Sequence, residues 1–123
     1  MADRITDYKD LDVWSVSMRL VRVVYQITAC MPPAERFGLI AQMRRAAVSV
    51  PSNIAEGYGR ATPGDYARFA RVARGSAAEL ETQVLIAVDL GMLGEGQAQE
   101  ALALVDRVKA MLHNLIRSLD SRQ

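Results

Sequence analysis

The sequence predicts an all-α protein: an antiparallel, up-down-up-down four-helix bundle that assembles into an oligomer. Apolar residues recur at intervals of three and four along four segments, short turn-forming stretches separate these segments, and none alternates as a strand would. Half of the 123 residues are hydrophobic and 24% are charged, as in an ordinary globular domain. We therefore assign residues 1–123 to a single domain.

The first helix is expected over residues 11–31 and is unusually apolar. Its polar residues form one narrow stripe, with steps of three and four: Asp12, Ser15, Arg19, Arg22 and Gln26. The remaining apolar face is wider than a single core requires, so we expect one face to pack in the bundle and another against a second subunit. Cys30, the only cysteine, is expected to be a small core residue.

The second helix is expected over residues 35–59, after the proline pair of "MPPAERFG", and it contains Pro51. A proline in a helix interior removes a hydrogen bond and costs roughly 3 kcal/mol. We nevertheless expect the helix to continue, because the apolar positions keep their phase from Ala46 through Val50 to Ile54. Only the longer version also matches its neighbours in length.

The third helix is expected over residues 63–90 and the fourth over 96–120. Thr62 suits the N-cap of the third helix, Pro63 its first position and Asp65 a capping box. Gly91 is a natural stop. In the fourth helix apolar residues recur at steps of four and three from Ala101 to Leu119, the regular pattern of a bundle.

A line of polar side chains borders the apolar face of the second helix. They share one stripe at steps of three and four: Gln42, Arg45, Ser49, Asn53, Glu56 and Arg60. On the third helix, Ser76 and Glu79 are expected to face them, with Gly75 and Ser76 permitting close approach of the backbones.

We interpret this line as a polar network that fixes the register of helices or subunits, because partly buried polar groups must be hydrogen-bonded. Arg45 and Arg60 are available to pair with Glu79 and Glu56, and Glu56 is expected to be hydrogen-bonded. A ligand site or catalytic site is the alternative interpretation.

The net charge of +1 does not by itself indicate a nucleic-acid partner, but the charges are unevenly distributed. Residues 36–74 hold seven arginines and two acids, whereas residues 75–106 hold six acids and no base. We expect contacts to phosphates from a row on the third helix and one residue of the second: Arg68, Arg71, Arg74 and Arg44. Tyr58 and Tyr66 are candidates for stacking on bases. The alternative is solvated helix faces whose charges pair with each other.

The sequence offers little for catalysis, and we expect a protein that is not an enzyme, without catalytic residues, a metal or a cofactor. His113 is the only histidine and lies in no metal-binding motif, and "GYGRATPG" lacks the dinucleotide-binding spacing. No apolar run is long enough to span a bilayer and the first residues are polar, so we expect a cytoplasmic protein with no membrane association.

Four stretches resemble one known family in order and spacing: "DLDVW", "PPAERFGL", "QMRRAAVSVPSNIAEGYGR" and "ARGSAAELETQ". They are similar to the 23S rRNA-intervening-sequence proteins, also called the four-helix bundle protein family, roughly from Tyr8 to Leu93. The resemblance implies a ring-like homopentamer. It also implies kinship with the accessory proteins of diversity-generating retroelements, which bind nucleic acid and a reverse transcriptase.

We therefore expect a non-enzymatic homo-oligomer that binds RNA or DNA through basic surface patches. Two alternatives stay open. One is a scaffold for another protein, such as a reverse-transcriptase accessory protein of a diversity-generating retroelement. The other is an enzyme that uses Asn53, Glu56 and Arg60.

Overall fold

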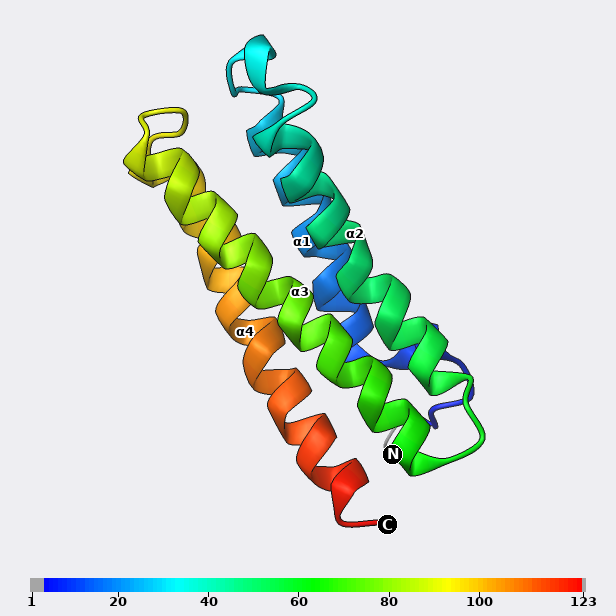
Figure 1. Ribbon diagram of the computed structural model, residues 1–123. Coiled ribbons are helices and arrows are strands. Elements are labelled where there is room, and N and C mark those ends of the chain that lie inside the picture. Colours follow the sequence, from blue (N-terminus) through cyan, green and yellow to red (C-terminus); the bar gives the residue numbers. More distant parts are fainter. Residues whose placement is uncertain (1–3, 123) are drawn as a thin grey trace.

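Four long helices make up the computed structural model, which describes residues 4–122 (Figure 1). They are α1 (Asp12–Thr28), α2 (Leu39–Tyr58), α3 (Pro63–Asp89) and α4 (Glu95–Asp120), with short 3₁₀ helices η1 (Tyr8–Asp10) and η2 (Pro33–Glu35). Residues 4–122 contain no strand, so the all-α class with four helices is confirmed. Residues 1–3 and 123 of the predicted domain lie outside the described part of the chain.

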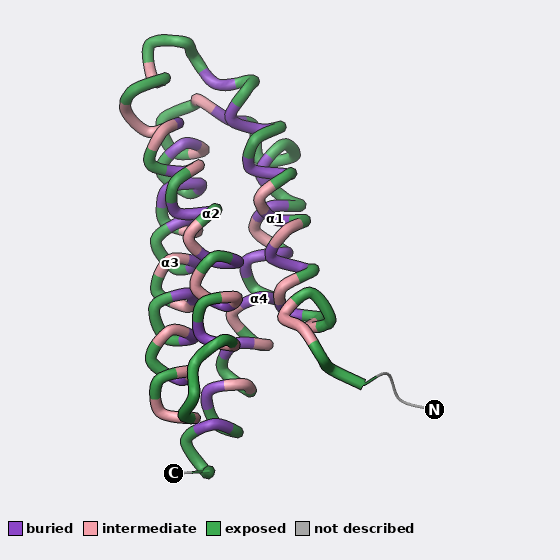
Figure 2. Tube along the Cα trace, turned by 90° about the vertical axis from the view of Figure 1, so that its right-hand side faces the viewer, coloured by how far each residue is buried: buried purple, intermediate pink, exposed green. Residues whose placement is uncertain are grey.

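The helices lie side by side around one core. The connections from α1 to α2 and from α3 to α4 lie at one end of the molecule, and that from α2 to α3 lies at the other (Figure 1). Each helix packs against two neighbours: α1 against α2 and α4, and α3 against α2 and α4. Along every helix buried and exposed residues recur in turn, as expected when one side faces a shared core (Figure 2).

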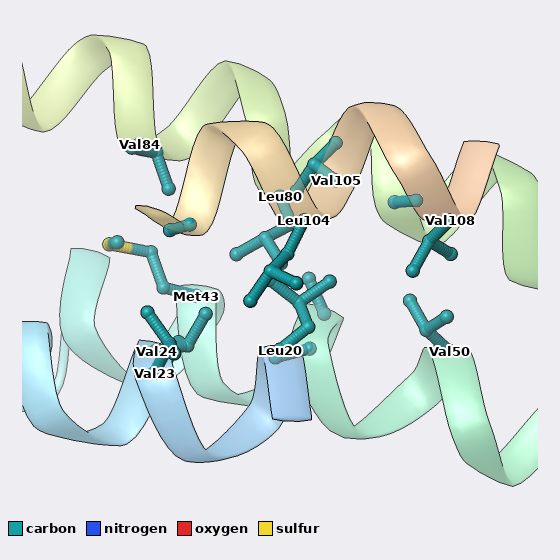
Figure 3. Close-up of a cluster of buried hydrophobic side chains, with 14 of the residues drawn as sticks. Leu20, Val23, Val24, Met43, Val50, Leu80, Val84, Leu104, Val105 and Val108 are labelled. Carbon is teal, nitrogen blue, oxygen red and sulfur yellow. The ribbon is translucent and has the colours of Figure 1, made fainter. Parts of the chain in front are cut away.

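The core is filled by aliphatic side chains from all four helices. Leu20 of α1, Met43 of α2 and Leu80 of α3 are fully buried, and Val105 and Val108 of α4 complete the same cluster (Figure 3). No membrane-spanning candidate occurs among the helices of residues 4–122, since none is both long and apolar enough.

The boundary between the first two helices differs from the prediction. The α1 helix ends at Thr28 instead of residue 31, and α2 begins at Leu39 instead of residue 35. Pro32 has an extended backbone, and η2 occupies the next three residues. The Glu35 carboxylate then accepts a hydrogen bond from the Leu39 amide at 3.2 Å, which places Glu35 before the helix as a capping group.

The prediction that Cys30 is a core residue is wrong. Its side chain is exposed, and Met31 is buried at this end of the bundle instead. Cys30 follows Gln26 by four residues and so continues the exposed stripe of α1, whereas Met31 follows the buried pair Ile27 and Thr28.

Helix α2 runs through Pro51, as predicted. Pro51 itself is buried, and Ala46, Val50 and Ile54 all face the core on both sides of it. The α3 and α4 boundaries lie within one residue of those predicted. Gly91 ends α3 with a φ of +74°, and the Met92 amide donates back to the Ala87 carbonyl, as in a Schellman motif.

Helices α2 and α3 lie very close together at Gly57. A Cβ atom placed there would come within 2.8 Å of the Phe69 Cβ and 3.0 Å of the Tyr66 ring. The sequence interpretation assigned this role to Gly75, which was wrong, because a Cβ at Gly75 would meet nothing within 4 Å. Gly57 is therefore the glycine that the packing of these helices requires.

Replacing Gly57→Ala is expected to lower the free energy of unfolding by about 1–3 kcal/mol, as other overpacking substitutions do. The measurement is chemical denaturation at one fixed protein concentration. Gly75→Ala is the matched control, also within a helix. It should leave stability unchanged or raise it by up to about 1 kcal/mol through helix propensity. Equal effects of the two substitutions would contradict the assignment.

Candidate functional site

Polar side chains of α2 and α3 line an open groove of about 350 Å³. The lining residues are Gln42, Arg45, Ala46 and Ser49 from α2, and Ser76, Glu79 and Gln83 from α3. Five of these belong to the predicted polar network, so the structure brings together its upper part, from Gln42 to Ser49, with Ser76 and Glu79. They meet because they occupy facing stripes of two adjacent helices.

A chain of hydrogen bonds joins the two walls of the groove. The hydroxyl oxygens of Ser49 and Ser76 lie 2.8 Å apart across the helix interface. The Asn53 amide nitrogen donates to the Ser49 carbonyl at 2.8 Å and to the Ser49 hydroxyl oxygen at 2.9 Å. Within the predicted network, hydrogen bonds link Ser49, Asn53 and Ser76, which we call the serine network.

Gln83 lies deepest in this wall. Its side chain is only 7% exposed, and its Oε1 atom is buried without a hydrogen-bond partner in the described structure. Buried acceptors are almost always satisfied in folded proteins, so this atom is an exception that calls for a physical reason.

The lower part of the predicted network lies outside the groove. Glu56 and Arg60 are exposed at the end of α2, and their charged groups are 3.7 Å apart. The expectation that Glu56 is hydrogen-bonded is therefore wrong: its contact is a loose, solvated ion pair with Arg60. Arg60 also lies over the Phe69 ring, at 4.6 Å. The enzyme alternative named three residues, and they do not form one cluster. Asn53 belongs to the serine network, whereas Glu56 and Arg60 lie at the exposed end of α2.

The predicted phosphate contacts do not form one patch. Arg68 lies 3.8 Å from Asp65, and Arg71 forms an ion pair with Asp120 of α4. Arg74 is half-buried further along α3. Arg44 faces α1, where its Nε donates to the Thr28 hydroxyl at 2.9 Å. Arg68 and Arg71 each pair with a carboxylate of the same molecule. This agrees with the alternative interpretation, in which the charges of the helix faces pair with each other.

Arg60 and Arg68 both lie over the Phe69 ring, at 4.6 Å, and a second group of arginines and aromatic rings lies at the end of the bundle where α1 connects to α2. The Arg44 guanidinium lies over the exposed Tyr25 ring at 4.5 Å, and that of Arg36 over the Phe37 ring at 5.2 Å. Phe37 is 88% exposed. Arg36 and Arg44 line one hollow of about 330 Å³, and neither forms an ion pair with a carboxylate of residues 4–122.

The sequence interpretation missed this arginine–aromatic surface, which we define as Arg36, Phe37, Arg44 and Tyr25. One signal was present, since "ERFG" places an aromatic residue beside an arginine in a turn, where little can bury it. The link between Tyr25 and Arg44 depends on how α1 packs on α2, and no local pattern reports that packing.

Tyr58 and Tyr66 pack against each other instead of presenting free faces. Their rings meet edge to face with centroids 6.1 Å apart. The Tyr66 hydroxyl is buried without a partner in the described structure, and burial raises the pKa of this phenol. Stacking on bases by Tyr66 would require it to leave this packing.

An apolar groove of about 340 Å³ runs between α1 and α2 on the outside of the bundle. Its walls are Tyr8, Trp14, Met18 and Val21 on one side, and Val48, Pro51, Ser52 and Ala55 on the other. A second apolar patch lies near the end of α3 and consists of Leu85, Ile86 and Leu90, all exposed. The wide apolar face predicted for the first helix is thus only partly covered by its own bundle.

Within residues 4–122, no three side chains of the metal-binding types gather as an ion site. His113 is exposed on α4. The main features of the described chain are its four helices, a polar groove between α2 and α3, and an apolar groove between α1 and α2.

These features define a class: an all-α protein of four helices that carries two outer grooves of opposite character. The sequence profile of the 23S rRNA-intervening sequence proteins matches residues 9–114, and the chain belongs to this family. The resemblance seen in the sequence motifs is thereby confirmed.

A solved structure supports the same fold. It is described as a protein of unknown function from the S23 ribosomal protein family of Bacteroides thetaiotaomicron VPI-5482, and it superposes with a TM-score of 0.77. The two chains are 19% identical, with 85% of this chain and 97% of that chain covered. At this identity the likeness is one of fold. No curated protein matches the chain.

Because Ser49 is hydrogen-bonded and Glu56 is exposed, substitutions at these two positions of α2 are expected to change the stability of the protein by different amounts. Ser49→Ala should lower the free energy of unfolding by about 1 kcal/mol, because it leaves Ser76 and Asn53 short of a partner. Glu56→Ala should change it by less than about 0.5 kcal/mol, as expected for an exposed site. Thermal denaturation of four variants measures these effects: Ser49→Ala, Ser76→Ala, the double variant Ser49→Ala/Ser76→Ala, and Glu56→Ala. The double variant should cost less than the sum of its single changes.

Proposed function

We propose that this protein is a non-enzymatic, antiparallel up-down-up-down four-helix bundle that associates with copies of itself and binds single-stranded RNA or DNA. The arginine–aromatic surface carries the proposal. Proteins that bind single strands combine cationic side chains, which contact phosphates, with exposed rings on which bases stack. This surface offers both at one end of the bundle.

Phe37 is the strongest element of that surface. An aromatic side chain that is 88% exposed gains nothing from the core, and Arg36 beside it supplies a cation at 5.2 Å from the ring. Arg44 and Tyr25 repeat the pair on the adjoining helices. Since neither arginine is neutralised by a carboxylate in residues 4–122, both charges are available to a phosphate.

The row on α3 contributes less in this proposal. Arg68 and Arg71 each have a carboxylate neighbour, and a phosphate would have to compete with it. Arg74 has no such neighbour among the described ion pairs and can extend the basic surface along α3.

Self-association is supported by the two apolar surfaces. The groove of α1 and α2 and the patch of Leu85, Ile86 and Leu90 lie on different parts of the chain. Contact between two unlike surfaces is heterologous, and such contacts close into a ring when the rotation per subunit allows it. We propose five subunits, as the family resemblance implies. A ring would also repeat the arginine–aromatic surface and raise its avidity for a long strand.

A protein scaffold is the second candidate function, and the same apolar groove favours it. A partner helix with an apolar face, for example from a reverse transcriptase, would fit such a groove in place of another subunit. The two candidates differ in which surface matters, since a scaffold needs the groove and a nucleic-acid protein needs the arginines.

We expect labelled single-stranded RNA to bind with an affinity that falls steeply as salt rises. Arg36→Ala combined with Arg44→Gln should reduce the slope of log affinity against log salt by roughly 0.7 for each lost phosphate contact. Phe37→Ala should weaken binding by roughly 1–3 kcal/mol with little change of slope, because it removes stacking. The measurement is fluorescence anisotropy over a salt series.

Arg107→Ala combined with Arg117→Ala is the control, because it removes two exposed arginines of α4 and leaves the surface intact. Absence of binding at about 50 mM salt would reject nucleic-acid binding. A slope that the control lowers as much as the surface variants do would reject this surface as its site.

Light scattering is expected to give the mass of five chains for the unmodified protein. Val48→Asp, in the wall of the apolar groove, should shift the mass toward a single chain, because a buried unpaired carboxylate is costly at an interface. Val72→Asp is the control: Val72 is 47% exposed, against 40% for Val48, and lies outside both apolar surfaces. A monomeric unmodified protein would reject self-association.

A further inference from the structure

We infer that the outer side of α1 in one copy of the chain docks on the α3–α4 end of a second copy, with Arg22 of the first opposite Asp89 of the second. We define the receiving surface, the α3–α4 face, as Leu85, Ile86, Asp89, Leu90, Glu95 and Leu102. The inference rests on the proposed self-association and goes beyond it, because it names the charge pair that sets the register of the contact and the direction in which copies follow one another.

The apolar part of this face covers two helices. Leu85, Ile86 and Leu90 of α3 are 52%, 41% and 61% exposed. Leu85 also lines a hollow of about 540 Å³ that extends to Leu102 of α4. Burial of such side chains against a partner is favourable, and a contiguous exposed apolar surface is typical of a site of protein contact.

Two carboxylates lie within the same face. Asp89 lines a hollow together with Leu85 and Ile86. Glu95 lines the adjoining hollow, which shares Leu85. Neither carboxylate forms an ion pair in the described part of the chain, and residues 75–106 contain no basic residue. A partner that covers this face must therefore bring a positive charge as well as apolar side chains, because a carboxylate that loses its water without a counter-charge is costly.

The outer side of α1 meets both requirements. Trp14, Met18 and Val21 follow one another at steps of four and three and form the α1 wall of the apolar groove. Arg22 is four residues beyond Met18 and so lies beside this stripe, exposed and without an ion pair in residues 4–122. A helix with apolar side chains at this spacing is the form that binds apolar grooves. Since the stripe and the α3–α4 face are both uncovered, one contact between copies covers both.

One molecule cannot make this contact with itself. Helix α1 packs against α2 and α4, and α3 packs against the same two, so the α1–α2 pair and the α3–α4 pair lie on opposite sides of the bundle. Arg22 and Asp89 nevertheless lie toward the same end, because the connection after α1 and the connection after α3 lie together (Figure 1). Arg22 is six residues before the end of α1, or about 9 Å at the rise of an α-helix. Two copies that point the same way therefore need only a small shift along their axes to bring these charges together.

The first test exchanges the two charges. Arg22→Asp and Asp89→Arg should each raise the concentration at which the assembly dissociates by about tenfold or more, because each places like charges opposite one another. Both substitutions in one chain should restore that concentration to within about threefold, since the pair forms again with its signs exchanged. Light scattering over a dilution series measures this.

Arg22→Asp combined with Glu79→Arg is the matched control. Glu79 is also an exposed acid of α3 without an ion pair in residues 4–122, but it lines the polar groove instead of the α3–α4 face. This combination should not restore the assembly. If it restores the assembly as well as the exchange with Asp89 does, or if neither does, the inference is overturned.

The second test traps the contact. Arg22→Lys keeps the positive charge and supplies an amine, which a carbodiimide joins to a carboxylate in contact with it. Peptide mapping should find residue 22 of one copy linked to Asp89 of another. Because each copy has both surfaces, the products should form a ladder up to the mass of the intact assembly. Asp89→Asn in the same background should remove the ladder.

The outcomes separate this contact from self-association itself. A monomeric unmodified protein would reject both. An assembled protein in which residue 22 links only to other carboxylates, or whose dissociation neither charge reversal changes, would leave self-association standing and overturn this contact.

Discussion

The close packing of α2 on α3 is the constraint on which the rest of this structure depends. It requires Gly57, where a Cβ would clash with Phe69, and the small buried residue Ala46 lies beside residues of α3 in the same groove. With the backbones this near, the Ser49 and Ser76 hydroxyls meet directly. Gln42, Arg45 and Glu79 are exposed beside this contact, whereas Gln83 is buried in the α3 wall, and together they line the polar groove.

Much of the fold could be predicted because helix periodicity is a local property. Four helices follow from apolar spacing alone, and the unbroken phase across Pro51 correctly overrode the usual meaning of a proline. The errors lie where the chain leaves this regularity. The Pro32–Pro33 pair ends α1 early and delays α2 until Glu35 can cap it. Gly75 and Gly57 are both helical glycines, and only the tertiary packing tells which one another helix approaches.

For the candidate sites as well, local patterns could be predicted and tertiary contacts could not. Residues on one stripe of one helix were correctly grouped, so Gln42, Arg45 and Ser49 do share a groove. Contacts between side chains of different helices were harder to predict. Arg71 finds its carboxylate 49 positions away, at Asp120, and so is less available to a phosphate than its spacing indicated. The unsatisfied oxygen of Gln83 has no sequence signature at all, because burial of one atom depends on every neighbouring side chain.

The order in which the helices pack has a consequence for how the chain folds. Three of the four helix–helix interfaces join helices that are consecutive in sequence, and the contact between α1 and α4 alone closes the set. Contacts between sequence neighbours form quickly because little loop entropy is lost. On a ribosome α1, α2 and α3 can therefore assemble as they emerge. Their α4-facing side, which includes Leu20 and Leu80, stays open to water and to other nascent chains until α4 has been made.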